Sequence, residues 1–491
     1  MLNGLVRSGS IVAALLGLAA CGDSSSPASD AAPPAADAGP PIAEAPVRPG
    51  PAGSGTLVDA DGRTVILRGT NIRAAAIFDE WKTHTPIPPF DAEEDCRVIG
   101  EDLGLNQLRL ALSWSLLEPE RGHIDETYLA SLVAVAAACQ AHGVYTLIDL
   151  HQDGFSKYVG EDGAPFWAHN PPLPAADMDE SNGGHATTDP VTQTQLAGFF
   201  ADHDGLVADY ARTAAALAAA VDQQPGVIGL ELMNEPVADP DDLAFFHTTV
   251  GAAVRAAAPG LPIYFEPDAT RNVVDFARPA VLDLPRIVYA PHLYTGVFQG
   301  NWQLGDTQRI EDSVVGMLDE ALVNAAPTMV TELGNNPSDA TGVAWLDAAY
   351  ASLDRHLLSA SFWVYEEWPS NCGSPACWGF YDETPVADSS PPRFERTMRD
   401  AAVAHVARAY PRAIAGTLDA FHYEVPMRTL TVTLHGATAG GVHVLAAPDL
   451  VYPSGVVVTC DDQPVTATRL PGRVEVACAG TTLVLSPAPL P

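Results

Sequence analysis

The sequence predicts an α/β protein, a (β/α)8 TIM barrel followed by a C-terminal β-sandwich domain. Eight short apolar segments alternate with helical patterns over roughly 350 residues, the repeat expected of parallel strands joined by helices. A doubly wound sheet is the alternative, but no glycine-rich phosphate loop follows the first strand. In a barrel the chemistry belongs at the C-terminal ends of the strands, so candidate site residues are sought there.

Each expected barrel strand is a short apolar run bounded by turn residues. In chain order the runs are 65–72 (VILRGTNI), 105–114 (LNQLRLALSW), 145–151 (YTLIDLH), 227–235 (VIGLELMNE), 263–267 (IYFEP), 287–294 (IVYAPHLY), 328–335 (TMVTELGN) and 361–367 (SFWVYEE). Helical patterns lie between them, with Asp or Asn caps at the start and Gly or Pro at the end. The clearest of these span 125–143, 203–225 and 306–326.

From about residue 415 the pattern changes to alternating strands separated by turn residues. The runs are RTLTVTLHG, GVHVLAA, GVVVTC, RVEVAC and TTLVLSP. This pattern predicts a β-sandwich over 415–491, after a catalytic barrel over 56–414. Structural support for the barrel and carbohydrate binding are both open roles for it.

The first 55 residues have the features of an export signal and a tether. Residues 1–10 contain one Arg and no acid, and 11–20 are apolar or small, too short a run to span a bilayer. The sequence Leu-Ala-Ala-Cys ending at Cys21 resembles the bacterial lipobox, which implies a cleaved signal peptide over 1–20 and lipid modification of Cys21. An ordinary signal with a chance cysteine is the alternative. Residues 21–55 are rich in Pro, Ala and Ser and predict an extended tether.

This N-terminus implies a protein exported and lipid-anchored to the bacterial cell envelope. Gly22, where an Asp would retain the protein at the inner membrane, favours the outer membrane or the cell surface.

Charge and cysteine content limit the partners further. The formal net charge is −36, which argues against nucleic acid as a partner and against electrostatic docking on anionic lipid. Without Cys21 six cysteines remain, and in an exported protein they predict disulfides: the local pairs Cys372–Cys377 and Cys460–Cys478, and Cys96–Cys139 between two helices. Zinc binding by these cysteines is the weaker hypothesis because the chain has no CxxC pair. We expect a monomer without metal or cofactor.

Two glutamates end apolar strand segments, where a charge is costly unless it has a function. Glu235 ends the run GLELMNE, and Glu332 lies in TMVTELGN. Two carboxylates on opposite strands of one barrel are what retaining glycoside hydrolysis requires, one as nucleophile and one as acid and then base, about 5 Å apart.

With these residues in place, the chain resembles glycoside hydrolase family 5, which is part of the large clan of retaining (β/α)8 glycosidases. The resemblance covers roughly residues 56–411 and rests on polar residues that follow in the family's order at the strand ends: Arg109, His151, Asn234, Glu235, His292, Tyr294, Glu332 and Trp363.

The resemblance implies a role for each of these residues. Glu235 is the acid/base and must carry a proton that the charge of Glu332 helps it to keep, while Glu332 is the nucleophile. Arg109 and Tyr294 would keep Glu332 ionised. The remaining residues are implied to bind substrate: Asn234 at the sugar 2-hydroxyl, His151 and His292 around the subsite, and Trp363 under the ring. The two histidines are also implied to position the acid/base. Glu231 points inward but lies deeper, which favours an internal ion pair, and Trp368 is a rival to Trp363.

Several stretches are similar to one branch of the family, the endoglycoceramidases, which cut the bond between an oligosaccharide and ceramide. They include His151-Gln152-Asp153, the turn 163–165 and the helix before LMNEP. The branch implies that Asp153 binds the first sugar, although an Asp before Gly154 also stabilises turns. The nucleophile segment TELGNN departs from the branch, so galactosylceramide or a steryl glucoside stays open as substrate.

Aromatic residues in three loops favour an apolar trough for lipid chains. They lie in 77–90, in 296–302 and in the insertion between His151 and Gly205, which holds Phe155, Tyr158, Phe166 and Trp167. They are equally compatible with sugar stacking or with packing of the loops.

The expected substrate is therefore a glycosphingolipid or another β-glycoside. An endo-β-glucanase or β-mannanase of the same family is the first alternative, and a non-catalytic carbohydrate-binding lipoprotein is the second. A metal hydrolase using His151, Asp153 and His292 is weaker because the ligand spacing is irregular.

Overall fold

The computed structural model describes residues 46–51, 53–73, 90–175, 183–366, 378–387, 389 and 393–489. The signal peptide, Cys21, the tether up to residue 45, residues 77–89, Trp368 and the Cys372–Cys377 pair lie outside this part, so these predictions stay predictions. Within the described residues, no helix combines the length and the apolar character needed to cross a membrane.

All eight predicted barrel strands are present, and each pairs with its neighbours in parallel. They are β4 (Arg68–Ile72), β5 (Gln107–Ser113), β6 (Tyr145–His151), β7 (Val227–Glu231), β8 (Ile263–Phe265), β9 (Ile287–Tyr289) with β10 (His292–Leu293), β11 (Met329–Leu333) and β12 (Ser359–Phe362). β9 and β10 are two parts of the sixth strand. A parallel bridge from Tyr289 to Thr328, just before β11, closes the ring. The barrel prediction is confirmed.

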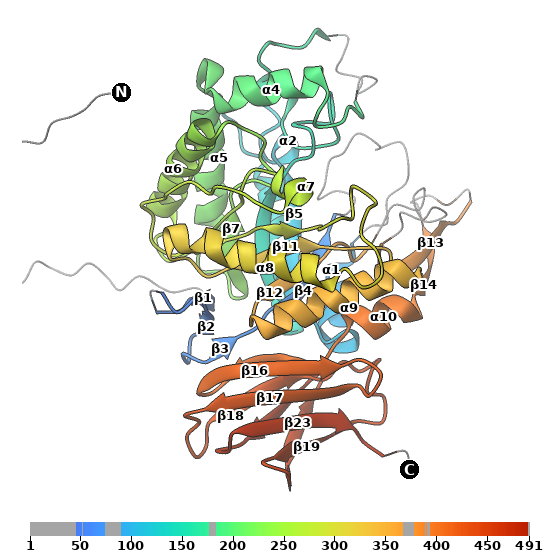
Figure 1. The fold of residues 1–491 in the computed structure, drawn as a ribbon. Helices are drawn as coiled ribbons and strands as arrows, with labels where there is room; N and C mark the ends of the chain where they lie inside the picture. The colour runs from blue at the N-terminus through green and yellow to red at the C-terminus, as the bar shows by residue number, and fades with distance from the viewer. Residues whose placement is uncertain are drawn as a thin grey trace, which may run out of the picture. The chain divides into compact units, whose positions relative to one another are not determined.

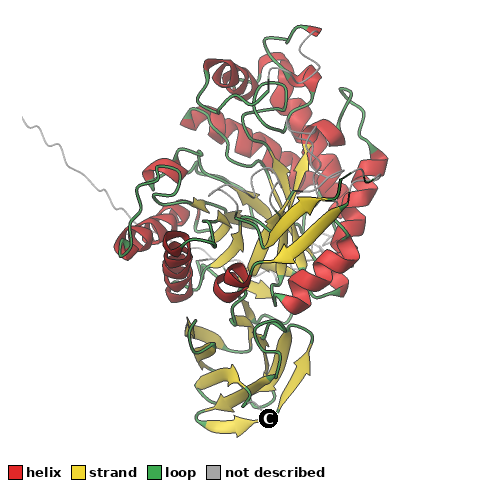
Figure 2. Cartoon of the chain, turned by 90° about the vertical axis from the view of Figure 1, so that its right-hand side faces the viewer, coloured by secondary structure: helices red, strands yellow, loops and turns green. Residues whose placement is uncertain are grey.

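Helices surround these strands (Figures 1 and 2). They are α1 (Ala92–Arg97), α2 (Trp114–Leu117), α3 (Glu126–Ala141), α4 (Pro190–Phe200), α5 (Leu206–Val221), α6 (Pro240–Ala257), α7 (Arg271–Val274), α8 (Thr307–Ala321), α9 (Ala340–Arg355) and α10 (Asp400–Val406). The three helices predicted most clearly correspond to α3, α5 and α8. Asp125 caps α3 as expected, because its side chain accepts the backbone N–H groups of Thr127 and Tyr128.

The C-terminal strands form two antiparallel sheets, as the alternating pattern predicts. One sheet has the order β16-β17-β23-β19-β20, and the other the order β1-β2-β3-β15-β18-β22-β21. The strands of the five-stranded sheet are β16 (Thr417–Glu424), β17 (Thr429–His435), β23 (Thr482–Pro487), β19 (Val456–Cys460) and β20 (Gln463–Val465). The strands of the seven-stranded sheet are β1 (Val47–Pro49), β2 (Leu57–Asp59), β3 (Thr64–Val65), β15 (Pro411–Ile414), β18 (Val442–Ala446), β22 (Arg473–Ala477) and β21 (Ala467–Leu470). A separate hairpin, β13 (Tyr381–Pro385) with β14 (Phe394–Met398), follows β12.

The structure differs from the predicted domain boundaries at two places. β1 lies inside the expected tether of 21–55 and pairs with β2, and Val47 is fully buried. β3 pairs with β15, so the segment before the barrel belongs to the same sheet as the C-terminal strands. The sequence hid this connection because it joins residues about 350 positions apart through strands of two to four residues, too short to show a period.

One face of the seven-stranded sheet packs against the barrel interior near the N-terminal ends of the strands. Val65 and Ala413 of the sheet share a cluster of buried side chains with Leu147, Ile228 and other inward-facing barrel residues. The sheet therefore covers the N-terminal ends of the strands, and the C-terminal ends carry the pocket described below.

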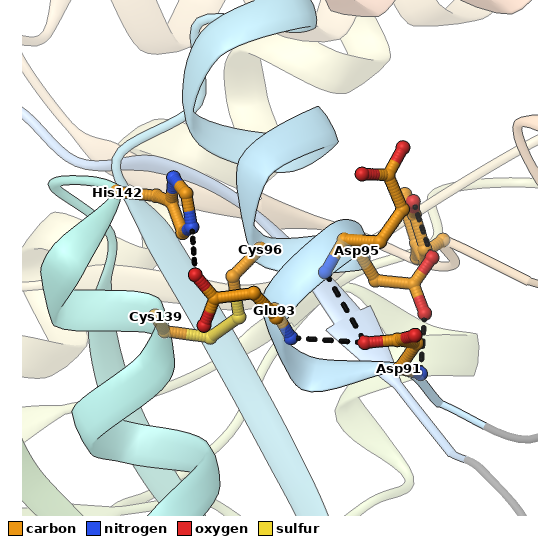
Figure 3. Close-up of a disulfide and its surroundings, with 8 residues drawn as sticks. Asp91, Glu93, Asp95, Cys96, Cys139 and His142 are labelled. Atoms are coloured by element: carbon orange, nitrogen blue, oxygen red, sulfur yellow. Dashed lines mark hydrogen bonds and ion pairs between the residues drawn. A yellow bond between two sulfur atoms is a disulfide. The ribbon is translucent and has the colours of Figure 1, made fainter.

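Two of the predicted disulfides lie among the described residues. Cys96 of α1 is bonded to Cys139 of α3, with their Cα atoms 4.8 Å apart (Figure 3). Cys460 and Cys478 are bonded with a Cα separation of 5.9 Å. Beside the first disulfide, His142 contacts Glu101 at 2.9 Å and Glu93 at 3.3 Å, which links the same two helical segments through polar groups.

Candidate active site

A pocket of about 360 Å³ opens at the C-terminal ends of the barrel strands. Its lining includes most of the predicted site residues: His151, Asp153, Asn234, Glu235, Tyr294, Glu332 and Trp363. Arg109 and His292 are not among its lining residues and contact Glu332 and Glu235 from the barrel interior. The predicted contacts of Arg109 with Glu332 and of His292 with the acid/base candidate Glu235 are present. Substrate binding by these two residues stays a prediction.

Glu332, in β11, is held by two donors. Arg109 Nη1 donates to its Oε1 at 2.5 Å, and the Tyr294 hydroxyl donates to its Oε2 at 2.8 Å. Burial and the charge of Glu235 raise the pKa of Glu332 above its usual value, although the nearby charges of His292 and Arg109 oppose this shift. Burial and the adjacent carboxylates raise the pKa of Tyr294 well above its usual value, so this hydroxyl keeps its proton and donates. The two short hydrogen bonds favour the ionised carboxylate that a nucleophile needs.

Glu235 is the second residue after the buried apolar run that contains β7. Its side chain is 22% exposed. Its Oε1 accepts hydrogen bonds from His292 Nδ1 at 2.8 Å and from Asn272 Nδ2 at 2.6 Å. Its backbone has a φ of 43°, in the left-handed region that non-glycine residues rarely adopt. Glu266 Oε2 accepts its backbone N–H at 3.0 Å, and Gln152 Nε2 donates to its carbonyl at 3.0 Å.

The two catalytic candidates both approach one nitrogen, Nδ1, of the imidazole of His292. His292 Nδ1 lies 2.8 Å from Glu235 and 3.5 Å from Glu332, and one oxygen of each glutamate lies within 4.8 Å of the other and of this ring. Burial lowers the pKa of His292, but Glu266, Glu332 and Glu235 outweigh burial and raise it well above its usual value. The three carboxylates thus favour the protonated, positively charged form of the ring.

Arg109, in β5, is fully buried and joins four carboxylates at the centre of the barrel. It contacts Glu231 at 2.7 Å, Glu332 at 2.5 Å, Asp149 at 3.0 Å and Glu266 at 3.2 Å. Burial opposes its charge, and these four carboxylates raise its pKa well above the usual value. The predicted internal ion pair of Glu231 is confirmed.

His151 and Trp363 form one wall of the pocket. Their rings stack with centroids 5.5 Å apart and an interplanar angle of 12°. His151 Nδ1 contacts Asp149 at 2.6 Å, and its Nε2 lies 3.4 Å from Asp153. Burial lowers the pKa of His151, but Asp149 and Asp153 outweigh burial and raise it well above its usual value.

The aromatic residues of the long insertion pack with one another and do not line the pocket. Phe155 contacts His169, Tyr158 contacts Phe166, and Trp167 packs edge-on against Trp114. Of the possibilities left open for these residues, the structure shows packing of the loops, because their aromatic surfaces contact other rings. The insertion instead gives the pocket polar groups, including Asp153, Glu161 and His185.

Apolar groups reach the pocket from other loops. Phe298, which is 56% exposed, and Trp378 both line it, and their rings stack at 6.5 Å. Phe298 lies in the predicted segment 296–302, but Trp378 follows the eighth strand and was not predicted. Nothing in its local sequence distinguishes it from Trp368, which lies ten residues earlier.

Three groups of acidic and histidine side chains here have the spacing of metal ligands: His151 with Asp153 and Asp162, His292 with Glu235 and Glu332, and His292 with Glu231 and Glu266. The three residues of the metal-hydrolase alternative are divided between these groups. In the second group Arg109 and the charged His292 already supply cationic partners for the carboxylates. Its donor set therefore fits acid–base chemistry better than a bound cation.

Comparison with known proteins agrees with this geometry. The model of the cellulase family, glycosyl hydrolase family 5, matches residues 58–367. The chain belongs to glycosyl hydrolase family 5. It is 29% identical over 451 residues to endoglycoceramidase I of Rhodococcus hoagii, with 84% of this chain and 82% of that protein covered.

Solved structures with the same fold extend beyond the family-5 barrel. Endo-glycoceramidase II from Rhodococcus sp., in a complex with ganglioside GM3, is 22% identical and superposes with a TM-score of 0.71 over 88% of this chain and 99% of that one. A crystal structure of endogalactoceramidase is 23% identical, with a TM-score of 0.70 over 90% of this chain and all of the other. Both likenesses cover a larger share of this chain, 88% and 90%, than the family match over residues 58–367.

Three residues that hold Glu235 were not predicted from the sequence: Glu266, Asn272 and Gln152. Glu266 ends the fifth strand segment IYFEP, so the rule that singled out Glu235 and Glu332 applies to it as well. Asn272 lies in the short helix α7 and has no such signal. Gln152 was quoted only as part of His151-Gln152-Asp153, and its contact with the Asn234–Glu235 turn is set by tertiary structure.

Proposed function

We propose that this family-5 enzyme hydrolyses the β-linkage between the glycan and the ceramide of glycosphingolipids, with retention of configuration. The observation that carries the proposal is a pair of close carboxylates, Glu235 and Glu332, in a pocket whose rim is apolar on one side. The relationship to endoglycoceramidase I over most of both chains supports the same substrate class.

The separation of the two glutamates favours retention over inversion. Retaining enzymes hold the two carboxyl groups about 5–5.5 Å apart, whereas inverting enzymes keep them about 6.5–9.5 Å apart to admit a water molecule. The separation of at most 4.8 Å between one oxygen of each belongs with the first class.

In the first step Glu332 attacks the anomeric carbon and the glycosidic bond breaks, while Glu235 gives its proton to the departing ceramide oxygen. In the second step Glu235 takes a proton from water, which displaces Glu332 and releases the glycan with its original configuration. Arg109 and Tyr294 hold the nucleophile ionised. His292 and Asn272 fix the acid/base oxygen that does not exchange the proton.

The apolar rim supports a lipid leaving group. Phe298 lines the pocket, and Gln299 next to it donates to the carbonyl of Val273 at 2.5 Å, so this loop and α7 lie together. Val273, Val274 and Phe276 are 52%, 60% and 56% exposed. Exposed apolar side chains grouped beside a pocket mark a surface for an apolar partner.

Cleavage of a β-glucan or β-mannan is the second candidate. Trp363 and Trp378 both face the pocket, and indole rings also stack on sugars. A polysaccharide substrate, however, would not explain why aliphatic residues on α7 are exposed beside the pocket.

The test is to incubate the purified chain with a ganglioside in detergent, and separately with soluble β-glucan and β-mannan, and to follow products by mass spectrometry. Intact oligosaccharide and ceramide are the expected products. Glu235→Gln and Glu332→Gln should each lower the rate by at least about 1,000-fold. Glu424→Gln, at an exposed position of β16, is the matched control. Polysaccharide cleavage without ceramide release would contradict the substrate assignment but leave both glutamates in their roles.

We further propose that the enzyme is exported as a monomer and anchored in the bacterial envelope by lipid on Cys21. The lipobox-like sequence and the Pro/Ala/Ser-rich segment after it support this. Labelling with a radioactive fatty acid in a bacterial host should mark the wild-type chain and spare Cys21→Ser. Label retained by Cys21→Ser would contradict the anchor, and sedimentation of the detergent-solubilised chain above the mass of one copy would contradict the monomer.

A further inference from the structure

A second cavity lies at the end of the barrel opposite to the catalytic pair. It measures about 190 Å³, and its lining comes from the starts of β5 and β6 and from the seven-stranded sheet. Tyr145, which lines it, and His151, which lines the active-site pocket, are the first and last residues of β6. They are about 20 Å apart at the rise of an extended strand.

Arg412 of β15 points into this cavity with part of its guanidinium unsatisfied. The residue is 7% exposed. Its Nη2 donates to the carbonyl of Gly143 at 2.6 Å, but among the described residues its buried Nη1 has no hydrogen-bond partner. Burial lowers the pKa of Arg412, and the nearby charge of Arg473 lowers it further. A buried cation without a carboxylate partner is costly, so this position calls for an anion.

Arg473 of β22 brings a second guanidinium to the same place. A Cβ atom added to Gly143 would lie 3.0 Å from Arg473 Nη1 and 3.7 Å from Arg412 Nη2, so both side chains approach this glycine. The hydrogen bond of Arg473 within the described chain is a long one, from Nη1 to the carbonyl of Pro471 at 3.5 Å. Most of its donors are therefore available to a ligand.

The other charged groups of the cavity leave an excess of positive charge. Arg63 also lines it but is paired with Asp59 at 2.7 Å. Glu475, two residues after Arg473, contributes one negative charge. Two unpaired guanidiniums against one carboxylate leave one positive charge, in a protein whose net charge is −36.

We propose that this cavity binds a small molecule through an oxyanion group, a carboxylate, sulfate or phosphate. The forked donors of Arg412 and Arg473 match the oxygen pairs of such groups. Because the lining comes from both the barrel and the C-terminal sheet, the bound anion stabilises the packing of the sheet against the barrel. Hydrolysis at the distant pocket does not depend on it.

The experiment is calorimetric titration of the purified full chain with sodium sulfate, inorganic phosphate and sodium glucuronate at constant ionic strength. We expect at least one probe to bind the wild type with at least tenfold higher affinity than it binds Arg473→Gln or Arg412→Gln. Arg469→Gln, on the neighbouring strand β21, is the matched control, since Arg469 pairs with Asp449 at the surface. The control should titrate as the wild type does.

The probes distinguish the source of the anion. Binding of phosphate and sulfate alone would indicate a phosphoryl or sulfate group, and binding of glucuronate alone a carboxylate; each supports the site. Equal titration curves for the wild type and Arg473→Gln, or no binding of any probe up to about 10 mM, would overturn it. Should Arg412→Gln fail to fold, Arg473→Gln still decides, because its side chain is only half-buried.

Discussion

The carboxylate of Glu266 accepts the backbone N–H of Glu235 at 3.0 Å, although neither residue belongs to the other's strand. Its second oxygen lies 3.2 Å from His292 Nε2 and 3.2 Å from Arg109 Nη2. Glu266 thus supports the acid/base through its backbone and through the charge of the histidine that binds its side chain. It is a positioning residue.

Glu266→Gln should lower kcat by about 10- to 100-fold while changing KM less. The amide keeps the shape but removes the charge that raises the pKa of His292, so the imidazolium should lose its proton at lower pH. The alkaline limb of the pH–rate profile should accordingly move to lower pH. A parallel loss at every pH would contradict this role and indicate a structural one, and Glu475→Gln, in the distant cavity, is the control.

Arg109→Lys should reduce activity by more than about 100-fold and lower the free energy of unfolding by about 3 kcal/mol. A single ammonium group cannot reach the carboxylates on all sides of the guanidinium, so some become buried without a partner. Chemical denaturation and single-turnover kinetics test the two effects. Arg469→Lys at the surface should change neither, and wild-type stability of Arg109→Lys would contradict the network.

The protein should become less stable as the pH rises from about 4.5 to about 7, because of buried carboxyl groups at the β13–β14 hairpin. Burial raises the pKa of Glu383 to about 7, and it also raises the pKa of its neighbours Asp95 and Glu366, while Arg396 opposes the shift in all three. A carboxyl whose pKa is raised by folding binds its proton more tightly in the folded state. Its contribution is therefore complete below the unfolded pKa and is lost through the folded one.

Glu383→Gln should flatten this decline in melting temperature between pH 4.5 and pH 7. For Glu383 the effect is at most about 3 kcal/mol at neutral pH. An unchanged slope in the variant would show that the cluster does not titrate as described. Glu424→Gln at an exposed position should leave the slope as it is in the wild type.

Replacing both Cys96 and Cys139 with Ala should lower the free energy of unfolding by about 4 kcal/mol. The disulfide closes a loop of 43 residues, which restricts the unfolded chain more than the 18-residue loop of Cys460–Cys478, for which about 3 kcal/mol is expected. Urea denaturation of the two double variants compares them directly. A larger loss for the shorter loop would show that native-state contacts, such as those of His142, outweigh chain entropy.

Phe298→Ala and Trp378→Ala should raise KM for a ganglioside several-fold but leave the hydrolysis of a soluble aryl β-glycoside within about twofold. Both rings lie on the rim beside the exposed residues of α7, where a lipid would lie, and a small aryl group does not reach that surface. Parallel losses on both substrates would instead assign these rings to sugar binding. Phe245→Ala, which removes another exposed phenylalanine on α6, is the control.

By itself, the sequence determined the barrel, its eight strands and the two glutamates, Glu235 and Glu332, that meet in the pocket. Strand periodicity and helix caps are local signals, and polar residues such as Glu235 and Glu332 stand out where an apolar strand ends. The alternation of β17 and β22 likewise identified a sandwich, and the spacing of cysteines identified two disulfides that the structure contains.

Only the tertiary structure decided which side chains act together. Glu266, Asn272 and Gln152 meet at Glu235 because closure of the barrel brings separate strand ends together, and no local pattern encodes that closure. For the same reason Arg109 proved to contact Glu332 from the barrel interior, and the aromatics of the insertion proved to pack with each other. The pairing of β3 with β15, and with it the cavity at Arg412, depends on contacts between the two ends of the chain. Such contacts depend on packing between segments that are distant in the sequence, so no short segment predicts them by itself.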